Sequence, residues 1–253
     1  MKGEDRNTTV IESQYIWEMA VVQIKADFAS IQGFTIKGSY YGVQTFSHNT
    51  LIKENISRYN DVGIQIGIEY EFSSNSNIIE SNLIENNDCG IILDGSSGNN
   101  IIFHNIILSN QNHGIFLRFG DCNNNIITYN NISSNGEVGV WLTYNDSFNI
   151  IQHNKIIDNG EGILGWGILI DGSNHNQILE NNIYDNTRDA LVCGSLRDLI
   201  NDNWLKNNIF DSNYWGRARF FPKPILAVCG IFLFLRFFLI AFDMNPAQEP
   251  YDI

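Results

Sequence analysis

The chain has little proline, little cysteine and few basic residues, and each shortage excludes a class of protein. Its four prolines all follow position 221, so none interrupts the strands and turns before that point. The four cysteines show no C-x-x-C spacing, which argues against a thiolate zinc site or a redox pair. A net charge of −13 argues against nucleic acid as a partner, because a phosphate backbone needs a basic surface.

The first ten residues, MKGEDRNTTV, contain no apolar stretch of the kind found in a signal peptide. The sequence alone therefore leaves two alternatives, a cytosolic protein or a chain whose true N-terminus has been truncated. A hydrophobic content of 43% with 12% aromatic residues is that of a folded domain. We expect one elongated domain with a C-terminal appendage.

Asparagine recurs at a fixed interval over most of the chain. One series steps by 23 to 27 residues, and an apolar residue stands three positions before each member: Asn55, Asn82, Asn105, Asn130, Asn154, Asn181 and Asn208. A second series lies five residues after the first: Asn60, Asn87, Asn110, Asn135, Asn159, Asn186 and Asn213. A period of this length is typical of solenoids, whose repeats stack on their neighbours.

A small residue and a short apolar alternation follow in most repeats. The small residues are Gly63, Gly90, Gly114, Gly139, Gly167 and Ala190. Aliphatic residues stand one and three positions beyond them, which indicates a short strand with one buried face. In the last repeat this rule places Leu191 and Cys193 inside. The pattern predicts an all-β parallel solenoid of about eight or nine coils, stacked at about 4.8 Å.

The recurring asparagines have a physical role at the bends of such a coil. Their side-chain amides both donate and accept, so identical residues on successive coils can hydrogen-bond as a ladder. Asparagine also tolerates the left-handed backbone that tight bends require. We expect a structural ladder of Asn82, Asn105, Asn130, Asn154 and Asn181.

These repeats resemble the PbH1 repeats of the NosD-like group, which includes carbohydrate-binding and sugar-hydrolysis (CASH) domains. The N-x-x-x-x-N steps followed by G-I-x-L carry the resemblance over residues 31–213, and N-Y-W at 213–215 and the terminal E-P-Y-D-I resemble the group's closing block. The resemblance implies a single-stranded right-handed parallel β-helix over residues 1–215, a capping segment over 216–253 and an extracytoplasmic or cell-envelope location. The acidic metal loop of many such proteins is replaced here by an apolar stretch.

The outward positions two residues after the small residue of each repeat are Gln65, Ile92, Phe116, Trp141, Leu169 and Val192. The last five form an apolar stripe where a strand should show polar side chains to water. Phe116 and Trp141 fall on adjacent coils, so they are candidate ligand-binding residues that could stack against sugar rings. The alternative is that another part of the chain covers the stripe.

The next outward position contains the weak catalytic candidates Asp94, Arg118 and Asp171. An arginine between two carboxylates suggests a polysaccharide lyase or hydrolase. The two aspartates, however, lie three coils apart, about 14 Å by the strand spacing, whereas paired glycosidase carboxylates need roughly 5–9.5 Å. An ion pair between Asp94 and Arg118 on neighbouring coils is the simpler interpretation.

Candidate metal ligands occur in two places. His104 and His153 occupy one position on alternate coils with Tyr129 between them, and Cys89 and His113 precede rung glycines on adjacent coils. The first pair is about 10 Å apart by the strand spacing, and the second offers two ligands at best. The sequence predicts no cofactor, and copper and calcium stay as minor alternatives.

Residues 225–242 are apolar except for Arg236. We expect them to form part of the cap and to lie on the apolar stripe. A membrane-associated stretch is the alternative, although the basic residues before it and the acidic residues after it would leave the β-helix in the cytoplasm.

The leading functional hypothesis is a non-catalytic envelope scaffold or binding module whose partner is a polysaccharide or surface glycan. A polysaccharide lyase or hydrolase centred on Arg118 and a copper-delivery accessory protein are the alternatives.

Overall fold

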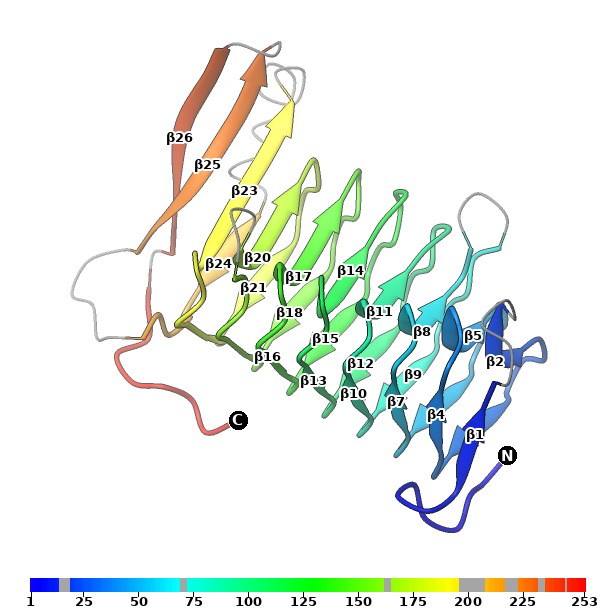
Figure 1. The fold of residues 1–253 in the computed structure, drawn as a ribbon. Coiled ribbons are helices and arrows are strands. Elements are labelled where there is room, and N and C mark those ends of the chain that lie inside the picture. The colour runs from blue at the N-terminus through cyan, green and yellow to red at the C-terminus, as the bar shows by residue number, and fades with distance from the viewer. Residues whose placement is uncertain are drawn as a thin grey trace.

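The chain folds into a right-handed parallel β-helix, as predicted from its repeats. The computed structural model describes residues 1–13, 19–68, 72–161, 165–195, 208–216, 223–231, 235–243 and 245–253. Figure 1 shows the coils stacked side by side, with the two termini at opposite ends of the stack. Every element of the described residues is a strand, and three strands form each complete coil.

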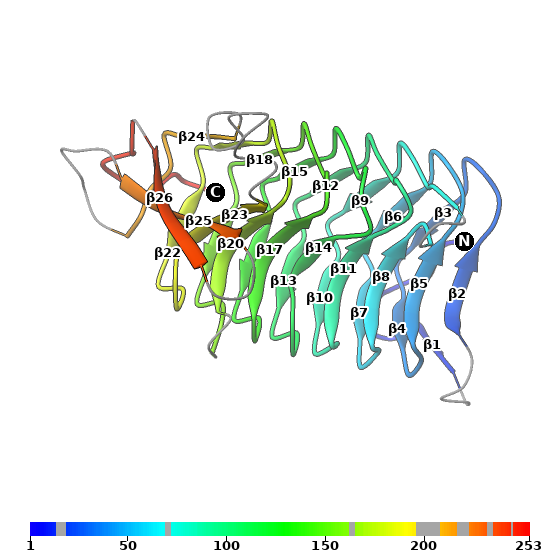
Figure 2. The ribbon, with the colours of Figure 1, turned by 90° about the horizontal axis from the view of Figure 1, so that it is seen from above.

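The strands build three faces that run the length of the stack, which Figure 2 shows from above. The first face contains β3 (Ser30–Gln32), β6 (Leu51–Lys53), β9 (Ile78–Glu80), β12 (Ile101–Phe103), β15 (Ile126–Thr128), β18 (Ile150–Gln152), β21 (Gln177–Leu179) and β24 (Ile209–Asp211). The second face contains β1 (Val10–Glu12), β4 (Thr35–Lys37), β7 (Ile56–Arg58), β10 (Leu83–Glu85), β13 (Ile106–Leu108), β16 (Asn131–Ser133), β19 (Lys155–Ile157) and β22 (Asn182–Tyr184). The third face contains β2 (Ala20–Ile24), β5 (Tyr41–Thr45), β8 (Val62–Ile66), β11 (Cys89–Leu93), β14 (Ile115–Leu117), β17 (Val138–Thr143), β20 (Trp166–Asp171) and β23 (Ala190–Ser195).

Branched aliphatic side chains fill the interior, because each short strand turns its middle or alternate residues inward. Parallel in-register pairing places identical types in contact, as in the stack Ile79, Ile102, Ile127, Ile151 and Ile178 of the first face. These five side chains are fully buried. At roughly 25 cal/mol per Å² of apolar area, such a column is the main stabilising term of the fold.

Three asparagine ladders run along the corners. In the first, the main-chain N–H and the Nδ2 of each residue donate to Oδ1 of the next, as from Asn105 to Asn130 at 2.9 and 3.0 Å and from Asn130 to Asn154 at 2.9 and 3.0 Å. This ladder runs through Asn55, Asn82, Asn105, Asn130, Asn154, Asn181 and Asn213. It ends on Asp243, whose carboxylate accepts from both nitrogens of Asn213 and from Trp215 Nε1. An acceptor-only group is a suitable terminus for a ladder that donates in one direction.

The structure corrects the asparagine analysis in two ways. Asn208 ends a third ladder that the sequence analysis missed, which runs through Asn77, Asn100, Asn125, Asn149, Asn176 and Asn208, and Asn213 ends the first ladder rather than the second. The left-handed backbone also belongs to the residue before each first-ladder asparagine. That residue has φ of 53° at His104, 53° at Tyr129 and 51° at His153.

The register of the last repeat differs from the prediction by one residue. Ala190 pairs with Ile168 rather than with Gly167, so Ala190 and Val192 face the core while Leu191 and Cys193 face outward. The outward stripe therefore continues through Leu191, and its predicted member Val192 is buried. A slip of one residue turns every side chain of a strand to the opposite face.

The apolar segment at the C-terminus forms strands β25 (Lys223–Ile231) and β26 (Leu235–Asp243). β25 pairs in parallel with β23 and antiparallel with β26, so the segment extends the third face at its last coil instead of lying on the outward stripe. Figure 1 shows this hairpin projecting beyond the coils. Within the described residues, no helix has the length and apolarity needed to cross a bilayer.

Candidate functional site

The outward side chains of the third face change character halfway along the stack. At the first coils they are Gln23, Gln44 and Gln65, and Gln23 Nε2 donates to Gln44 Oε1 at 3.0 Å. The same row then becomes apolar, with Ile92, Phe116, Trp141, Leu169 and Leu191 on successive strands. The aliphatic interior does not change at this point, so the difference is confined to the outer side of the third face, where Gln44, Gln65 and Ile92 are themselves buried.

Phe116 and Trp141 lie on paired positions of β14 and β17, and their rings stack at 4.6 Å with an interplanar angle of 13°. His113 packs at right angles to both, 5.0 Å from Phe116 and 4.9 Å from Trp141. Because the two rings cover each other, the pair supplies a ring stack within the row rather than two open platforms. Both side chains remain half-buried.

A hollow of about 170 Å³ opens beside this stack. It is lined by Phe116, Arg118, Phe119, Trp141, Thr143, Tyr144 and Asp171. Two of these aromatic residues, Phe119 and Tyr144, were not singled out in the sequence. They stand in left-handed turns with φ of 60° and 47°, and 36% and 67% of their surfaces are exposed. Bulky residues rarely adopt φ > 0, so an aromatic residue in a tight turn is unusual. Aromatic residues in the turns that follow the third-face strands are therefore the signal that could have identified these two.

The catalytic candidates divide between the hollow and the layer beneath it. Asp94 is only 2% exposed, and its Oδ2 accepts from Arg118 Nε at 3.1 Å, Arg118 Nη2 at 3.0 Å and Gln65 Nε2 at 2.8 Å. The guanidinium also lies over the Phe119 ring at 4.9 Å. Arg118 and Asp171 line the hollow, whereas Asp94 is buried in the ion pair that the simpler interpretation predicted.

His113 and Cys89 lie at the edge of the aromatic row. Burial, and then the charge of Arg118, lowers the pKa of His113 to about 4, so the imidazole is neutral at pH 7. Its Nε2 lies 3.5 Å from Glu137. Burial raises the pKa of the Cys89 thiol, while a hydrogen bond from the His113 main chain acts in the opposite direction. The thiol therefore meets the main chain of His113, and a protonated thiol is a poor metal ligand.

The other metal candidates occupy the corner between the first and second faces. The Tyr129 ring lies between the two imidazoles, 5.5 Å from His104 and stacked on His153 at 4.9 Å. His153 Nε2 lies 3.2 Å from Glu180. In the part of the chain that the structure describes, no group of three or more His, Cys, Asp or Glu side chains could hold a metal ion. Each of the two donor sets therefore brings at most two of the imidazole or thiolate ligands that copper prefers.

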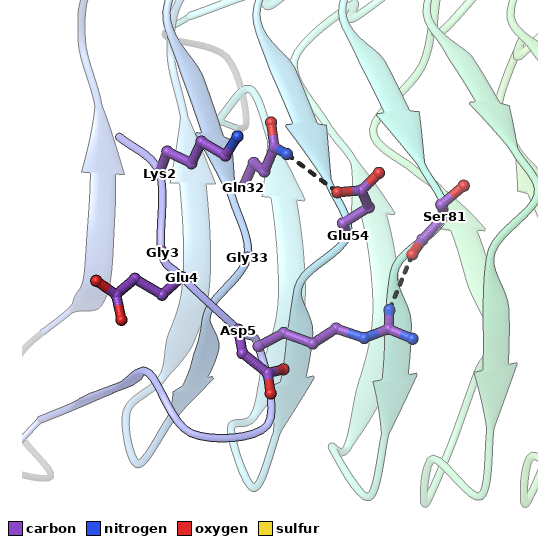
Figure 3. A pocket seen from close by; sticks show the side chains of 9 residues that line it. Lys2, Gly3, Glu4, Asp5, Gln32, Gly33, Glu54 and Ser81 are labelled. Atoms are coloured by element: carbon purple, nitrogen blue, oxygen red, sulfur yellow. Dashed lines mark hydrogen bonds between the residues drawn. The ribbon is translucent and has the colours of Figure 1, made fainter.

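A second hollow, of about 500 Å³, lies where the N-terminal segment crosses the corner of the first coils (Figure 3). Arg6 donates to the Ser81 carbonyl at 3.2 Å, and Gln32 Nε2 donates to Glu54 at 3.0 Å. Lys2 and Asp5 also line it, so its walls contain charges of both signs. We place the candidate site at the aromatic hollow, because aromatic side chains converge there with a few polar groups.

Comparison with solved structures finds two kinds of epimerase and a pectate lyase with a similar fold. The chain is similar to a mutant of the periplasmic alginate epimerase AlgG at 18% identity and a TM-score of 0.53, covering 89% of this chain and 46% of that one. It resembles the pectate lyase Pel9A at 11% identity and a TM-score of 0.58, covering 81% and 64%. The A-module of the Azotobacter vinelandii mannuronan C-5 epimerase AlgE4 gives 16% identity, a TM-score of 0.58 and coverages of 85% and 71%. At these identities the similarity shows the fold alone, and the chain spans about half the length of AlgG.

Comparison with curated proteins found no match. A family model described as "Periplasmic copper-binding protein (NosD)" matches residues 5–218, which is most of the chain and includes the candidate site. That description indicates an extracytoplasmic β-helix protein. With the fold, the repeats and this match in agreement, the chain belongs to the NosD family.

Proposed function

We propose that this chain is a non-catalytic, extracytoplasmic binding module and that the aromatic hollow is a subsite for a neutral polysaccharide. The observation that carries the proposal is the convergence of Phe116, Phe119, Trp141 and Tyr144 on one hollow of the third face. Aromatic surfaces suit the apolar faces of sugar rings, and Thr143 and Asp171 supply polar groups beside them.

The size and position of the hollow suit one unit of a longer polymer. At about 170 Å³ it is smaller than the roughly 300–1,000 Å³ of enclosed small-molecule pockets. It lies on a face that continues over neighbouring coils, so further units of an extended chain can lie along the same face. The polysaccharide enzymes with a similar fold support this class of ligand by analogy alone.

Charge favours a neutral glycan over a polyuronate. The net charge is −13, and Arg118, the cation that lines the hollow, is already paired with Asp94. A polyanion would meet repulsion that this pair does not offset. The same pairing argues against catalysis by Arg118, because its donors Nε and Nη2 are held by a buried carboxylate.

Affinity electrophoresis in gels that contain soluble polysaccharides tests the proposal. We expect neutral glucans, mannans or xylans to retard the protein more than alginate or pectate. Trp141→Ala or Tyr144→Ala should weaken that binding at least about fivefold, since truncating an aromatic anchor of an interface costs more than about 1 kcal/mol. Phe148→Ala is the matched control, because Phe148 is 54% exposed, has φ of 59° and lies outside the hollow. The proposal would be refuted if Trp141→Ala and Tyr144→Ala were retarded as strongly as the native chain, or if no polymer retarded the native chain. Release of unsaturated or reducing ends that Arg118→Ala abolishes would establish an enzyme instead.

A further inference from the structure

The turn that carries Tyr144 contains a fully buried carboxylate, Asp146. Its Oδ1 accepts from the main-chain N–H of Cys122 at 2.9 Å, and its Oδ2 accepts from that of Thr143 at 3.0 Å. One donor, the Cys122 N–H, therefore lies on the turn of the preceding coil, which carries Phe119, and the other, the Thr143 N–H, lies at the start of the turn that carries Asp146. A single side chain joins the two turns whose aromatic residues line the hollow.

Asp146 is an exception within its own column of the fold. In this column the main-chain N–H of one coil bonds the side chain of the next, from Ser74 to the Ser97 hydroxyl, from Ser97 to the Cys122 thiol and from Asp146 to the Ser173 hydroxyl. A hydroxyl or thiol provides one acceptor atom there. Asp146 provides two and adds a charge, in a position that solvent does not reach.

The second oxygen adds a hydrogen bond within the turn. In the two preceding coils the equivalent N–H groups, of Asp94 and Arg118, donate to the carbonyls of Ile66 and Leu93. Thr143 N–H donates to Asp146 Oδ2, and the Thr143 hydroxyl donates to the Leu117 carbonyl at 3.1 Å. These two side-chain hydrogen bonds lie immediately before Tyr144 and Asn145, whose φ values are 47° and 71°.

We propose that Asp146 is a positioning residue for the hollow: its ionised carboxylate holds the turns that carry Phe119 and Tyr144, and its protonation releases them. This inference rests on the proposed function, because it assigns to a buried group control over the geometry of that site. A protonated carboxyl can no longer accept equally at both oxygens, so one of the two N–H groups loses its partner. The binding-competent state is the ionised one.

The electrostatics allow this change near neutral pH. Burial raises the pKa of Asp146 to about 7, although the hydrogen bonds from the Cys122 and Thr143 N–H groups lower it. The negative charges of Asp121 and Asp94 act in the same direction as burial. The Cys122 thiol donates to the Arg118 carbonyl at 3.8 Å, and burial, followed by the charge of Asp146, raises its pKa well above the usual value, so it stays protonated. His113 has a pKa of about 4 and stays neutral above pH 5.

Two measurements on the full chain test the inference, one of them without any glycan. The ¹³C signal of the Asp146 carboxyl and the amide signals of Thr143 and Cys122 are followed by NMR from pH 5 to pH 9. We expect one titration with a midpoint near neutral pH, shared by all three signals. Amide signals of Thr143 and Cys122 that do not move with the carboxyl would overturn the inference, even if no glycan ever binds.

Glycan affinity at pH 8 and pH 6 is the second measurement. We expect it to weaken about tenfold in the native chain, because the competent fraction falls with protonation. Asp146→Ser places in this column the residue found at Ser97 and Ser173, keeps one acceptor for Cys122 N–H, and should bind weakly with no pH dependence. Asp146→Asn is the second variant should the first not fold. The inference would be overturned if the affinity of the variant depended on pH as that of the native chain does. If neither the native chain nor any variant bound a glycan, only the proposed function would be refuted.

Discussion

The corners of the β-helix repeat from coil to coil, whereas the outward row of the third face changes almost from strand to strand. Asparagine occupies the first corner ladder at seven successive coils, each bonded to the next. The outward row passes from glutamine to isoleucine, phenylalanine, tryptophan and leucine over the same stack. Positions that every coil needs are uniform because they stabilise the stack, and the departures from uniformity mark the candidate site.

The largest expected effect comes from breaking a corner. Asn130→Ala removes a fully buried amide that donates to Ile102 O, Thr128 O and Asn154 Oδ1 and accepts two bonds from Asn105. Because each orphaned buried group costs about 1–3 kcal/mol, we expect the free energy of unfolding to fall by at least about 3 kcal/mol. Urea denaturation measures this change. Asn131→Ala, at the adjacent half-buried strand position, is the control and should cost less than about 1 kcal/mol.

A smaller effect is expected at the glycine that bends the chain into the third face. A Cβ at Gly114 would lie 2.6 Å from the Gly139 carbonyl oxygen and 2.7 Å from Ile132 Cγ2. Gly114→Ala should therefore cost about 1–3 kcal/mol through overpacking. Thermal unfolding monitored by circular dichroism measures it. An unchanged midpoint would show that the close approach of neighbouring coils does not require glycine here.

The pH dependence of stability sharpens the comparison, since Asp146 is the carboxylate in a column whose other described members are Ser74, Ser97, Cys122 and Ser173. Burial raises the folded-state pKa of Asp146 from 3.8 to about 7, so between these values the folded state binds a proton that the unfolded state does not. Stability from this group is therefore present at low pH and is lost as pH rises from about 4 to 7, by up to about 1.4 kcal/mol per pH unit. Urea titrations at several pH values should show this slope in the native chain and lose it in Asp146→Ser. An equal slope in both proteins would contradict the assignment.

The smallest expected effect on stability is at the exposed turn aromatics. Tyr144→Ala removes a side chain that is 67% exposed, so the free energy of unfolding should change by less than about 0.5 kcal/mol. Its effect on glycan affinity should nevertheless be large. A variant that loses stability and affinity together would place Tyr144 among the structural positions instead.

The fold could be predicted from the sequence because corner asparagines and inward aliphatic residues recur with one period. The end of the stack could not, for a reason visible in the spacing. Three asparagine series lie five residues apart, and the last coil of the first ladder spans 32 residues from Asn181 to Asn213, so the ordinary interval leads to Asn208 of the third ladder. In the same coil Ala190 was taken as the counterpart of the glycine that precedes the other third-face strands, so the predicted register of this strand was wrong by one residue.

The candidate site could be predicted only where it belongs to a repeated strand position. Phe116 and Trp141 are paired members of the outward row, and Arg118 with Asp94 follows from the same register. Phe119, Tyr144 and Asp146 lie in turns, where the alternation of a strand no longer tells which side chains are buried. The burial of Asp146 depends on the Cys122 and Thr143 N–H groups that donate to it, and these contacts do not follow from the repeat period.

Mapping a neutral glycan by NMR tests the central claim most directly. We predict that a saturating oligosaccharide perturbs the amides of residues 116–119 and 141–145 and leaves the corner asparagines and the hollow around Lys2 and Arg6 unchanged. Perturbations confined to the N-terminal hollow, or spread evenly over all coils, would contradict it.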